Sequence, residues 1–334
     1  MTNVPLSSLL KYKLGVKMVF LTGLLNSIPG AIAQGLIWGL MAIGLYISYK
    51  ILDIADLTVD GSICTGACVC AVLMTNGVNV FVSMLLAFLA GALAGVVTGF
   101  FHTAMGIPPI LAGILTQLIL WSVNLKILGK ANMSLSARNY GVLLSSLNNW
   151  KAILVAAIFC AAVIVLLFLF FYTEIGLSVK STGDNEQMSR AQGINVNFNK
   201  VLGLAISNGI VALSGAILAQ YQGFADINMG RGAIVIGLAA IIIGLSVSMK
   251  IKSNFVVSLI GVVGGGIVYY LVYTIVIALG LDTDLLKMLS AVVVAIFLAI
   301  PYLKKTYFTK PKMPGMETTE PQSENEDIGG GENA

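Results

Sequence analysis

The chain has 334 residues, of which 57% are hydrophobic and only 10% are charged, and its formal net charge is +4. Soluble domains carry about 25% charged residues, so this chain has too few polar side chains to cover a surface in water. The composition predicts an all-α, polytopic membrane protein. Because the sequence has no basic run with interleaved aromatic residues, we expect no nucleic-acid partner.

The N-terminal segment, residues 1–29, is predicted to be cytoplasmic at its start and to contain a short apolar helix over 14–29. Lys11, Lys13 and Lys17 precede or begin this apolar run, and the sequence AIA that ends at Ala33 resembles a signal-peptide cleavage site. However, apolar sequence continues to Ile47, which favours an uncleaved helix. Whether residues 14–29 span the membrane or lie at its interface stays open.

The region 30–303 is predicted to form one transmembrane domain. A helix needs about 20 apolar residues to cross the bilayer core, and the sequence offers about nine such segments, with eight to ten as the range. These segments are 30–49, 61–76, 80–101, 109–125, 152–173, 201–221, 233–248, 254–279 and 285–303. Residues 304–334 are rich in proline, glycine and acidic side chains, so a disordered tail is expected there.

Basic residues predict the orientation, because lysine and arginine favour the cytoplasmic side. Lys304 and Lys305 follow the last predicted span, so the C-terminus is expected in the cytoplasm. Counting the spans backward from the C-terminus places further basic residues on the cytoplasmic side. These are Lys250 and Lys252, the lysines and the arginine of 179–200, and Lys50.

The predicted outer side nevertheless carries basic residues. The loop 126–151 contains Arg138, and Arg231 falls at an outer span end. Either these positions are tolerated exceptions to a statistical rule, or they form a docking surface for an acidic partner.

Small residues are predicted to bring helices close together. Gly91, Gly95 and Gly99 recur at four-residue spacing, and Gly35 with Gly39 repeats the pattern. Within a membrane, this spacing lets helix backbones approach. Packing inside the chain is favoured over a dimer contact.

The stretch DIADLTVDG, residues 53–61, interrupts the hydrophobic pattern with three carboxylates and a glycine. It is either a broken helix beside a solute pathway, as transporters use, or an ordinary cytoplasmic loop. Asp60 is a candidate pathway residue on the first interpretation, and at least one broken or short helix is expected.

Several kinds of chemistry are missing from the sequence. It has no G-x-x-x-x-G-K-[ST], no H-E-x-x-H and no G-x-S-x-G motif. We therefore expect a protein that is not an enzyme and that holds no cofactor or metal. The four cysteines lie in apolar segments and are expected to be buried, reduced thiols.

We expect no buried Asp, Glu or Arg within the spans, where coupled pumps often carry them. Uncharged polar residues do occur there. Each of them either forms a hydrogen bond between helices or contacts the solute in the pathway. The candidates are Gln34, Gln117, Asn208 and Gln220. Energy must therefore come from a partner, or transport is passive.

Three segments resemble one family. TGDNEQMSRAQGINVNFNKVLGLAISNGIVALSGAILA (182–219), DLTVDGSICTGA (56–67) and GLAAIIIGLSV (237–247) are similar to segments of bacterial ABC-importer permeases of the branched-chain amino acid and ribose type. The family pattern G-x-N-x-x-x-x-R/A-x-x-G-I/V is matched at Gly183, Asn185, Arg190, Gly193 and Ile194. The resemblance runs in order over about residues 30–303.

The chain departs from the family near the end of the resemblance. Ser246 and Ser248 stand where the family often has glycines, so details do not transfer there. Within the family, ILDIADLTVDGS (51–62) is similar to a subgroup associated with tryptophan or tyrosine uptake.

The resemblance implies a permease subunit in a bacterial cytoplasmic membrane. It implies three partners: a second permease copy or a paralogue, an ABC ATPase that binds ATP, and an extracytoplasmic solute-binding protein. The solute would be an amino acid, with tryptophan or tyrosine implied by the subgroup. The alternatives are a sugar or nucleoside permease and a self-sufficient secondary transporter or channel.

The resemblance also implies that the polar insert 179–200 couples the permease to the ATPase. Its candidate coupling residues are Gly183, Asp184, Asn185, Glu186, Arg190, Ala191, Gly193 and Ile194. Local chemistry agrees with a short helix here. Gly183 can end the preceding helix, the polar residues 184–186 suit a helix N-terminus, and Gly193 can close the helix. The alternative is a plain connecting loop.

Overall fold

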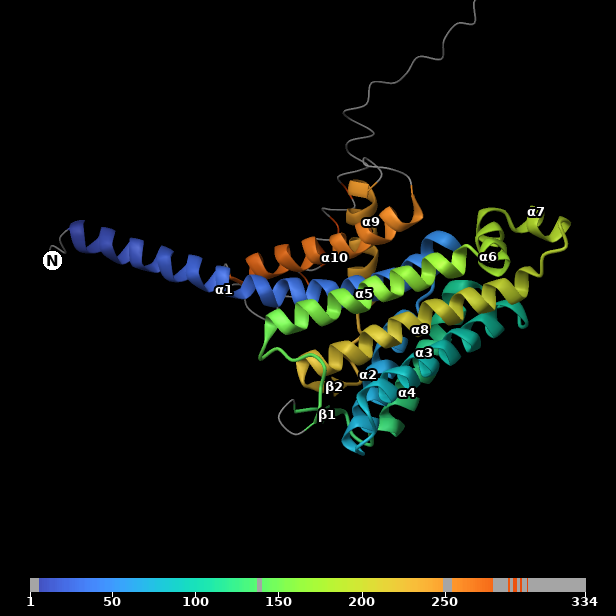
Figure 1. Ribbon diagram of the computed structural model, residues 1–334, viewed down its shortest axis with the longest axis horizontal. Helices are drawn as coiled ribbons and strands as arrows, with labels where there is room; N and C mark the ends of the chain where they lie inside the picture. Colours follow the sequence, from blue (N-terminus) through green and yellow to red (C-terminus); the bar gives the residue numbers. More distant parts are fainter. Residues whose placement is uncertain are drawn as a thin grey trace, which may run out of the picture.

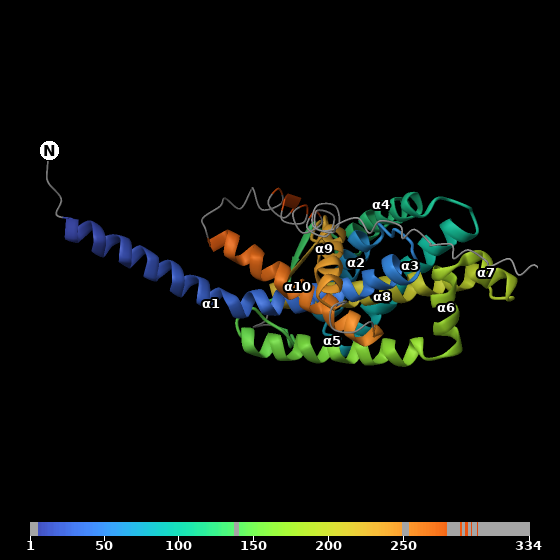
Figure 2. The same ribbon diagram turned by 90° about the horizontal axis from the view of Figure 1, so that it is seen from above.

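A computed structural model describes residues 6–136, 140–248 and 254–278, with five isolated positions beyond them. The described chain is a bundle of α-helices with one small antiparallel strand pair (Figures 1 and 2). The helices are α1 (Leu6–Tyr46), the π-helical turn η1 (Ile47–Ile51), α2 (Val59–Thr75), α3 (Val80–Thr103), α4 (Pro109–Leu128), α5 (Asn149–Phe171), α6 (Glu174–Asp184), α7 (Glu186–Ala191), α8 (Val196–Gln222), α9 (Ala233–Ser248) and α10 (Phe255–Ala278). Strands β1 (Asn132–Ser134) and β2 (Phe224–Asp226) pair with Met133 opposite Ala225.

Eight apolar helical segments of the described chain match eight of the nine predicted spans. Six are long and apolar enough to cross a membrane: Leu25–Ile51, α3, α4, α5, α8 and α10. Two are shorter, namely α2 and Ala233–Ser246 of α9. The all-α bundle and the expectation of short helices are thus confirmed. The ninth predicted span, 285–303, and the tail 304–334 lie outside the continuous described ranges.

Helix α1 differs from the expected boundary at residue 29. The sequence favoured a separate short helix over 14–29, whereas α1 continues through Pro29 to Tyr46 as one helix of 41 residues. At 1.5 Å per residue it is about 60 Å long. Its N-terminal part therefore projects beyond the bundle, as Figures 1 and 2 show. Proline is tolerated inside membrane helices more readily than in soluble ones.

Helix α8 is the centre of the bundle, and most of its residues from Ser207 to Tyr221 are buried. The glycine pattern of α3 lies against it. A Cβ at Gly91 or Gly95 would overlap backbone atoms of Asn208 or Leu204. Gly35 of α1 similarly contacts the backbone of α10 at Ile267. The predicted packing role of these small residues within the chain is confirmed.

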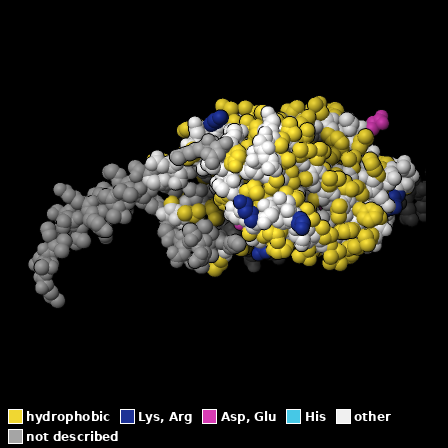
Figure 3. Space-filling view, turned by 90° about the horizontal axis from the view of Figure 1, so that it is seen from below, with side chains coloured by type: hydrophobic (Ala, Val, Ile, Leu, Met, Phe, Trp, Pro, Cys, Tyr) yellow, Lys and Arg dark blue, Asp and Glu magenta, His cyan; other side chains and the backbone are white. Residues whose placement is uncertain are grey.

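The outer helices leave apolar side chains exposed. In an 18-residue apolar stretch of each of the helices α3, α4 and α5, only 22% to 33% is buried within the chain. Figure 3 shows hydrophobic side chains over most of one face, with few charged groups among them. Since lipid is a favourable solvent for such a surface, this exterior agrees with a multi-pass membrane protein.

Candidate functional site

The polar insert forms two short helices at the end of the bundle opposite β1 and β2 (Figure 1). Thr173 caps α6 by accepting a hydrogen bond from the backbone N–H of Gly176 at 3.2 Å. Gly183 lies within α6, against the carbonyl oxygen of Ile51, which a Cβ would overlap. The prediction that Gly183 ends the preceding helix is therefore corrected by one residue, because α6 continues to Asp184 and the glycine serves close packing instead.

Helix α7 begins and ends as the sequence predicts. The side chain of Asn185 accepts a hydrogen bond from the backbone N–H of Met188 at 2.9 Å, which caps the helix. At the other end Gly193 has φ of +80°, in the left-handed region. The N–H of Gly193 bonds the carbonyl of Arg190, and the N–H of Ile194 bonds that of Ser189, each at 3.0 Å. This pattern is a Schellman motif, which glycine favours.

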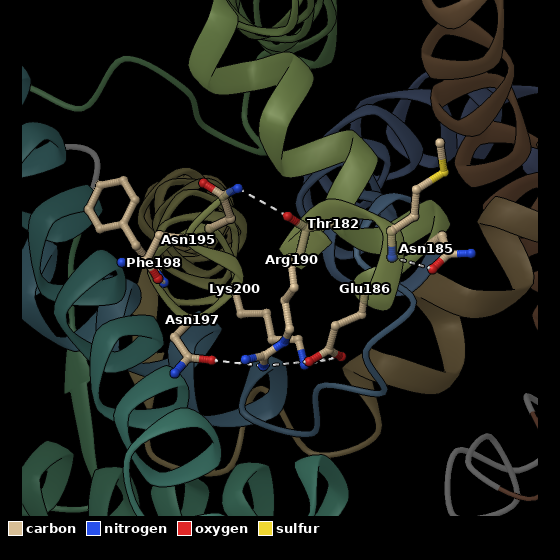
Figure 4. A network of polar contacts seen from close by, with 10 residues as sticks. Thr182, Asn185, Glu186, Arg190, Asn195, Asn197, Phe198 and Lys200 are labelled. Atoms are coloured by element: carbon tan, nitrogen blue, oxygen red, sulfur yellow. Dashed lines mark hydrogen bonds and ion pairs between the residues drawn. The ribbon is translucent and has the colours of Figure 1, made fainter. Parts of the chain in front are cut away.

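An ion-pair network joins α7 to the start of α8 (Figure 4). Glu186 Oε1 accepts from Arg190 Nη2 at 2.8 Å, and Glu186 Oε2 accepts from Lys200 Nζ at 2.7 Å. Arg190 also donates to Asn197 at 3.4 Å. Hydrogen bonds from Lys200 and Arg190 lower the pKa of the Glu186 carboxyl, because they stabilise its charged form.

Side-chain hydrogen bonds hold the insert to α8 and hold its two helices together. Asn199 of α8 donates to the Thr182 hydroxyl of α6 at 3.0 Å, and the Ser181 and Ser189 hydroxyls are 2.8 Å apart. Meanwhile, Met188 is 59% exposed, and Asp184 and Ala191 are exposed as well. The insert is thus a folded element with one face anchored and one face free, which a soluble partner could contact. Its coupling role is untested and stays a prediction.

A second polar cluster lies where the chain passes from α1 to α2. The carboxylate of Asp56 is 1% exposed and accepts a hydrogen bond from Asn208 Nδ2 at 2.6 Å. It also accepts from the backbone N–H of Thr58 at 2.9 Å. Asn208 in turn accepts from the Ser62 hydroxyl at 2.6 Å. Asp56 lies between the predicted spans 30–49 and 61–76, so it does not contradict the expectation of no buried Asp within the spans. The chain breaks helix here and turns the Asp56 side chain inward.

Asp60 joins α2 to α9. Its Oδ2 accepts from the backbone N–H of Gly232 and its Oδ1 from that of Ile234, each at 2.9 Å. These groups form the N-terminus of α9, where free N–H groups need partners. Because Asp60 bonds the N-terminus of α9, the stretch DIADLTVDG packs within the bundle, which favours the interpretation as a helix break. Its place beside a solute pathway stays a prediction.

A cavity of about 160 Å³ lies beside this break. Its lining includes Asp60 and Gln117, both predicted as pathway residues, and Arg231, predicted as a docking residue. The cavity also includes Asn124, which the sequence analysis missed. One signal was available, because Asn124 follows Gln117 by seven residues and so lies on the same helix face.

The other predicted pathway residues lie elsewhere. Asn208 belongs to the Asp56 cluster, and Gln34 is half-buried on α1. Gln220 accepts from the backbone N–H of Leu143 at 3.1 Å and donates to the carbonyl of Ala216 at 3.3 Å. Arg138 lies outside the described residues. All four cysteines are buried and unpaired by disulfides.

Known proteins resemble this chain over most of its length. Residues 27–300 match the family described as branched-chain amino acid transport system / permease component. The tyrosine transport system permease protein of Clostridioides difficile (strain R20291) is 40% identical over 277 residues, covering 82% of this chain and 91% of that protein. A protein of Rickettsia prowazekii (strain Madrid E) is 34% identical over 277 residues, covering 82% and 98%.

A third relative matches more weakly. The autoinducer 2 import system permease protein LsrC of Enterobacter sp. (strain 638) is 27% identical over 186 residues, covering 53% of this chain and 51% of that protein. No solved structure matches the chain. The family match and the two longer alignments confirm the resemblance carried by the insert and by the broken helix. The chain is a transport subunit of the ABC-permease type and belongs to the family of branched-chain amino acid transport system permease components.

Proposed function

We propose that this chain forms the solute pathway of an ABC importer for an aromatic amino acid, tyrosine or tryptophan. The observation that supports an aromatic amino acid as the solute is the 40% identity with a tyrosine transport system permease protein, over 91% of that protein's length. The helix break before α2, with the buried Asp56 cluster, supports a pathway near the middle of the bundle, because transporters place polar sites at interrupted helices.

The proposed energy source is a separate ABC ATPase, which binds and hydrolyses ATP. The exposed face of α6 and α7 is its proposed contact, because this face is folded and is joined to α8 by the bonds of Glu186 and Thr182. Such a connection gives nucleotide-driven motion a route to the spans, as coupling between two sites requires. With the insert cytoplasmic, α8 ends outside and the C-terminus of the chain lies in the cytoplasm.

The remaining proposed partners complete the importer in a bacterial cytoplasmic membrane. A second permease copy or a paralogue covers part of the exposed apolar exterior, and lipid covers the rest. An extracytoplasmic binding protein delivers the solute at the β1–β2 end. Arg138 and Arg231 are proposed as basic contacts for it, and Arg231 has a second candidate role, described below.

Uptake by cells tests this function. The chain would be expressed with the ATPase and binding-protein genes that neighbour its own, and import of radiolabelled tyrosine measured. Import should require the ATPase, and unlabelled tryptophan should compete while ribose and nucleosides should not. Import that persists without the ATPase would support a secondary transporter. Competition by a sugar or nucleoside alone would reject the amino-acid solute while keeping the permease.

A further inference from the structure

The cavity beside Asp60 contains a buried amide with no partner. Asn124 is fully buried, and neither its Oδ1 nor its Nδ2 has a hydrogen-bond partner. Buried amides are almost always satisfied, because an unmade bond costs the full desolvation of the group. Asn208 and Gln220, the other buried amides discussed above, obey that rule. The exception at Asn124 points to a ligand in the cavity.

The cavity also brings together side chains of opposite charge. Asp60 and Arg231 both line it, yet the ion pairs of the described residues do not include one between them. Asp60 is fixed by two backbone N–H groups, and each of its oxygens keeps a further lone pair. Arg231 is exposed and has its five N–H donors to offer.

The position of the cavity suits a transported solute. Ser62 of α2 bonds Asn208, which lies near the middle of α8, so Asp60, two residues before Ser62, is about level with the middle of that helix. The volume of about 160 Å³ exceeds several times the roughly 30 Å³ that one water occupies in the liquid. Trp121, which is 41% exposed, and Leu118 also line the cavity and give it an apolar side.

We propose that this cavity binds the zwitterionic head of a free amino acid. The carboxylate of the ligand pairs with Arg231 and accepts from Asn124 Nδ2. Its ammonium group donates to Asp60 and to Asn124 Oδ1, with Gln117 beside it, and its side chain packs against Trp121. Asn124 is the determinant of specificity, because its carboxamide offers a donor group, Nδ2, and an acceptor, Oδ1, to the two halves of the head group. The assignment rests on the proposed function, since it takes an amino acid to be the solute.

Binding to the purified full-length chain in lipid nanodiscs tests the proposal. A variant with Trp38→Phe and Trp150→Phe keeps Trp121 as the one indole, and selective excitation of that indole reports on the cavity. L-tyrosine and L-leucine should shift its emission. Tyramine, which lacks the carboxylate, and 3-(4-hydroxyphenyl)propionate, which lacks the ammonium group, should bind at least about tenfold more weakly. Equal binding of all four would overturn the proposal.

Two substitutions sharpen the test. Asn124→Leu should weaken L-tyrosine binding about tenfold while leaving thermal stability without solute unchanged or higher, because it removes an unsatisfied buried amide. Arg231→Gln should weaken L-tyrosine binding but not tyramine binding, and the outer Lys130→Gln serves as its matched control. A loss of stability in Asn124→Leu with normal tyrosine binding would show that the amide is structural.

The outcomes separate this proposal from the proposed function. If wild-type cells import tyrosine and Asn124→Leu binds and imports it unchanged, the cavity assignment is wrong and the proposed function stands. If L-leucine and L-tyrosine bind as described but cells import a different amino acid, the aromatic solute is wrong and the cavity assignment stands. If Asn124→Leu alters only the association of two permease copies, the amide serves an interface and the proposal falls.

Discussion

At the scale of single residues, this chain places carboxylates where helices are interrupted and satisfies them with neutral donors. Asp56 takes its bonds from an amide and a backbone N–H, and Asp60 takes its bonds from the N-terminus of α9. In a membrane interior each unmade bond to a charge is costly. These carboxylates therefore fix the two short helices α2 and α9 in place.

The hydrogen bonds of the Asp56 cluster predict that replacing Asn208 lowers the thermal stability of the protein. Asn208→Leu removes the donor at 2.6 Å from Asp56 and the acceptor of the Ser62 hydroxyl. A buried polar group that loses its hydrogen-bond partner costs about 1–3 kcal/mol, so the thermal midpoint of the purified protein should fall by several degrees. Asn197→Leu is the matched control, because Asn197 is exposed and should change the midpoint little. Equal midpoints for the two variants would contradict a structural role for the cluster.

Glu186 predicts a pH dependence outside the membrane. The pKa of its carboxyl is lowered from its ordinary value of 4.5 by Lys200 and Arg190. The two ion pairs therefore stabilise the folded state fully at a pH above 4.5, the ordinary pKa. This stabilisation is lost as the pH falls through the lowered pKa of the folded protein. Because the side chain is 41% exposed, the pairs are worth at most about 1 kcal/mol.

Amide hydrogen exchange of α7 measures this dependence. After correction for intrinsic exchange rates, protection of α7 should drop at most about fivefold on acidification. Glu186→Gln should already show the lower protection at neutral pH and should then vary little with pH. Protection that is the same in both proteins at every pH would exclude a role for these ion pairs.

At the scale of elements, α7 is held by its two ends more than by packing. The Asn185 cap and the left-handed Gly193 fix its length, and both were predictable because capping residues act locally. Gly183 was misread because its role is a contact with Ile51, distant in sequence. The same limit applies to the helix break. Its interruption was visible in the sequence, but the inward turn of Asp56 depends on Asn208, a partner far along the chain.

The candidate cavity shows the same division between local and distant information. Asp60 and Gln117 could be selected as polar residues in apolar sequence, but their meeting with Arg231 required the fold. Asn208 and Gln220 were selected on the same grounds, and both form hydrogen bonds within the chain. Polarity within a span identifies a residue that needs a partner, and only the tertiary structure shows which partner it has.

The end of α7 offers a test of coupling through backbone conformation alone. Gly193 has φ of +80° and no neighbour within reach of an added Cβ. Gly193→Val should therefore destabilise the helix end by about 1–2 kcal/mol without a clash. Solute-stimulated ATP hydrolysis by the reconstituted importer should be lost. Gly77→Val is the matched control, with φ of +81° and equally open space at the other end of the bundle. Equal stimulation in both variants would make α7 a connecting loop.

At the scale of the whole molecule, the arrangement of helices ties the membrane orientation to the polar insert. Helix α8 begins beside α6 and α7 and ends at β2, so the insert and the strand pair lie at opposite ends of the bundle (Figure 1). The insert carries an ion-pair network and exposed polar residues, among them Asp184, Gln187 and Arg190, which fits an aqueous surface. One orientation therefore determines the sides of both ends, and with them the sides on which the proposed ATPase and the proposed binding protein would bind.

Labelling of introduced cysteines decides between the two orientations. The four native cysteines are buried and would be replaced by alanine. Gln187→Cys in α7 and Lys130→Cys before β1 are both at exposed positions. An impermeant maleimide added to intact cells should label Lys130→Cys at once and Gln187→Cys only after permeabilisation. The reversed result would put the insert outside, where no ATPase could reach it, and would remove the coupling role of α7. Because both sites are tested in the same bundle, poor insertion would appear as equal labelling at both, which is distinct from either orientation.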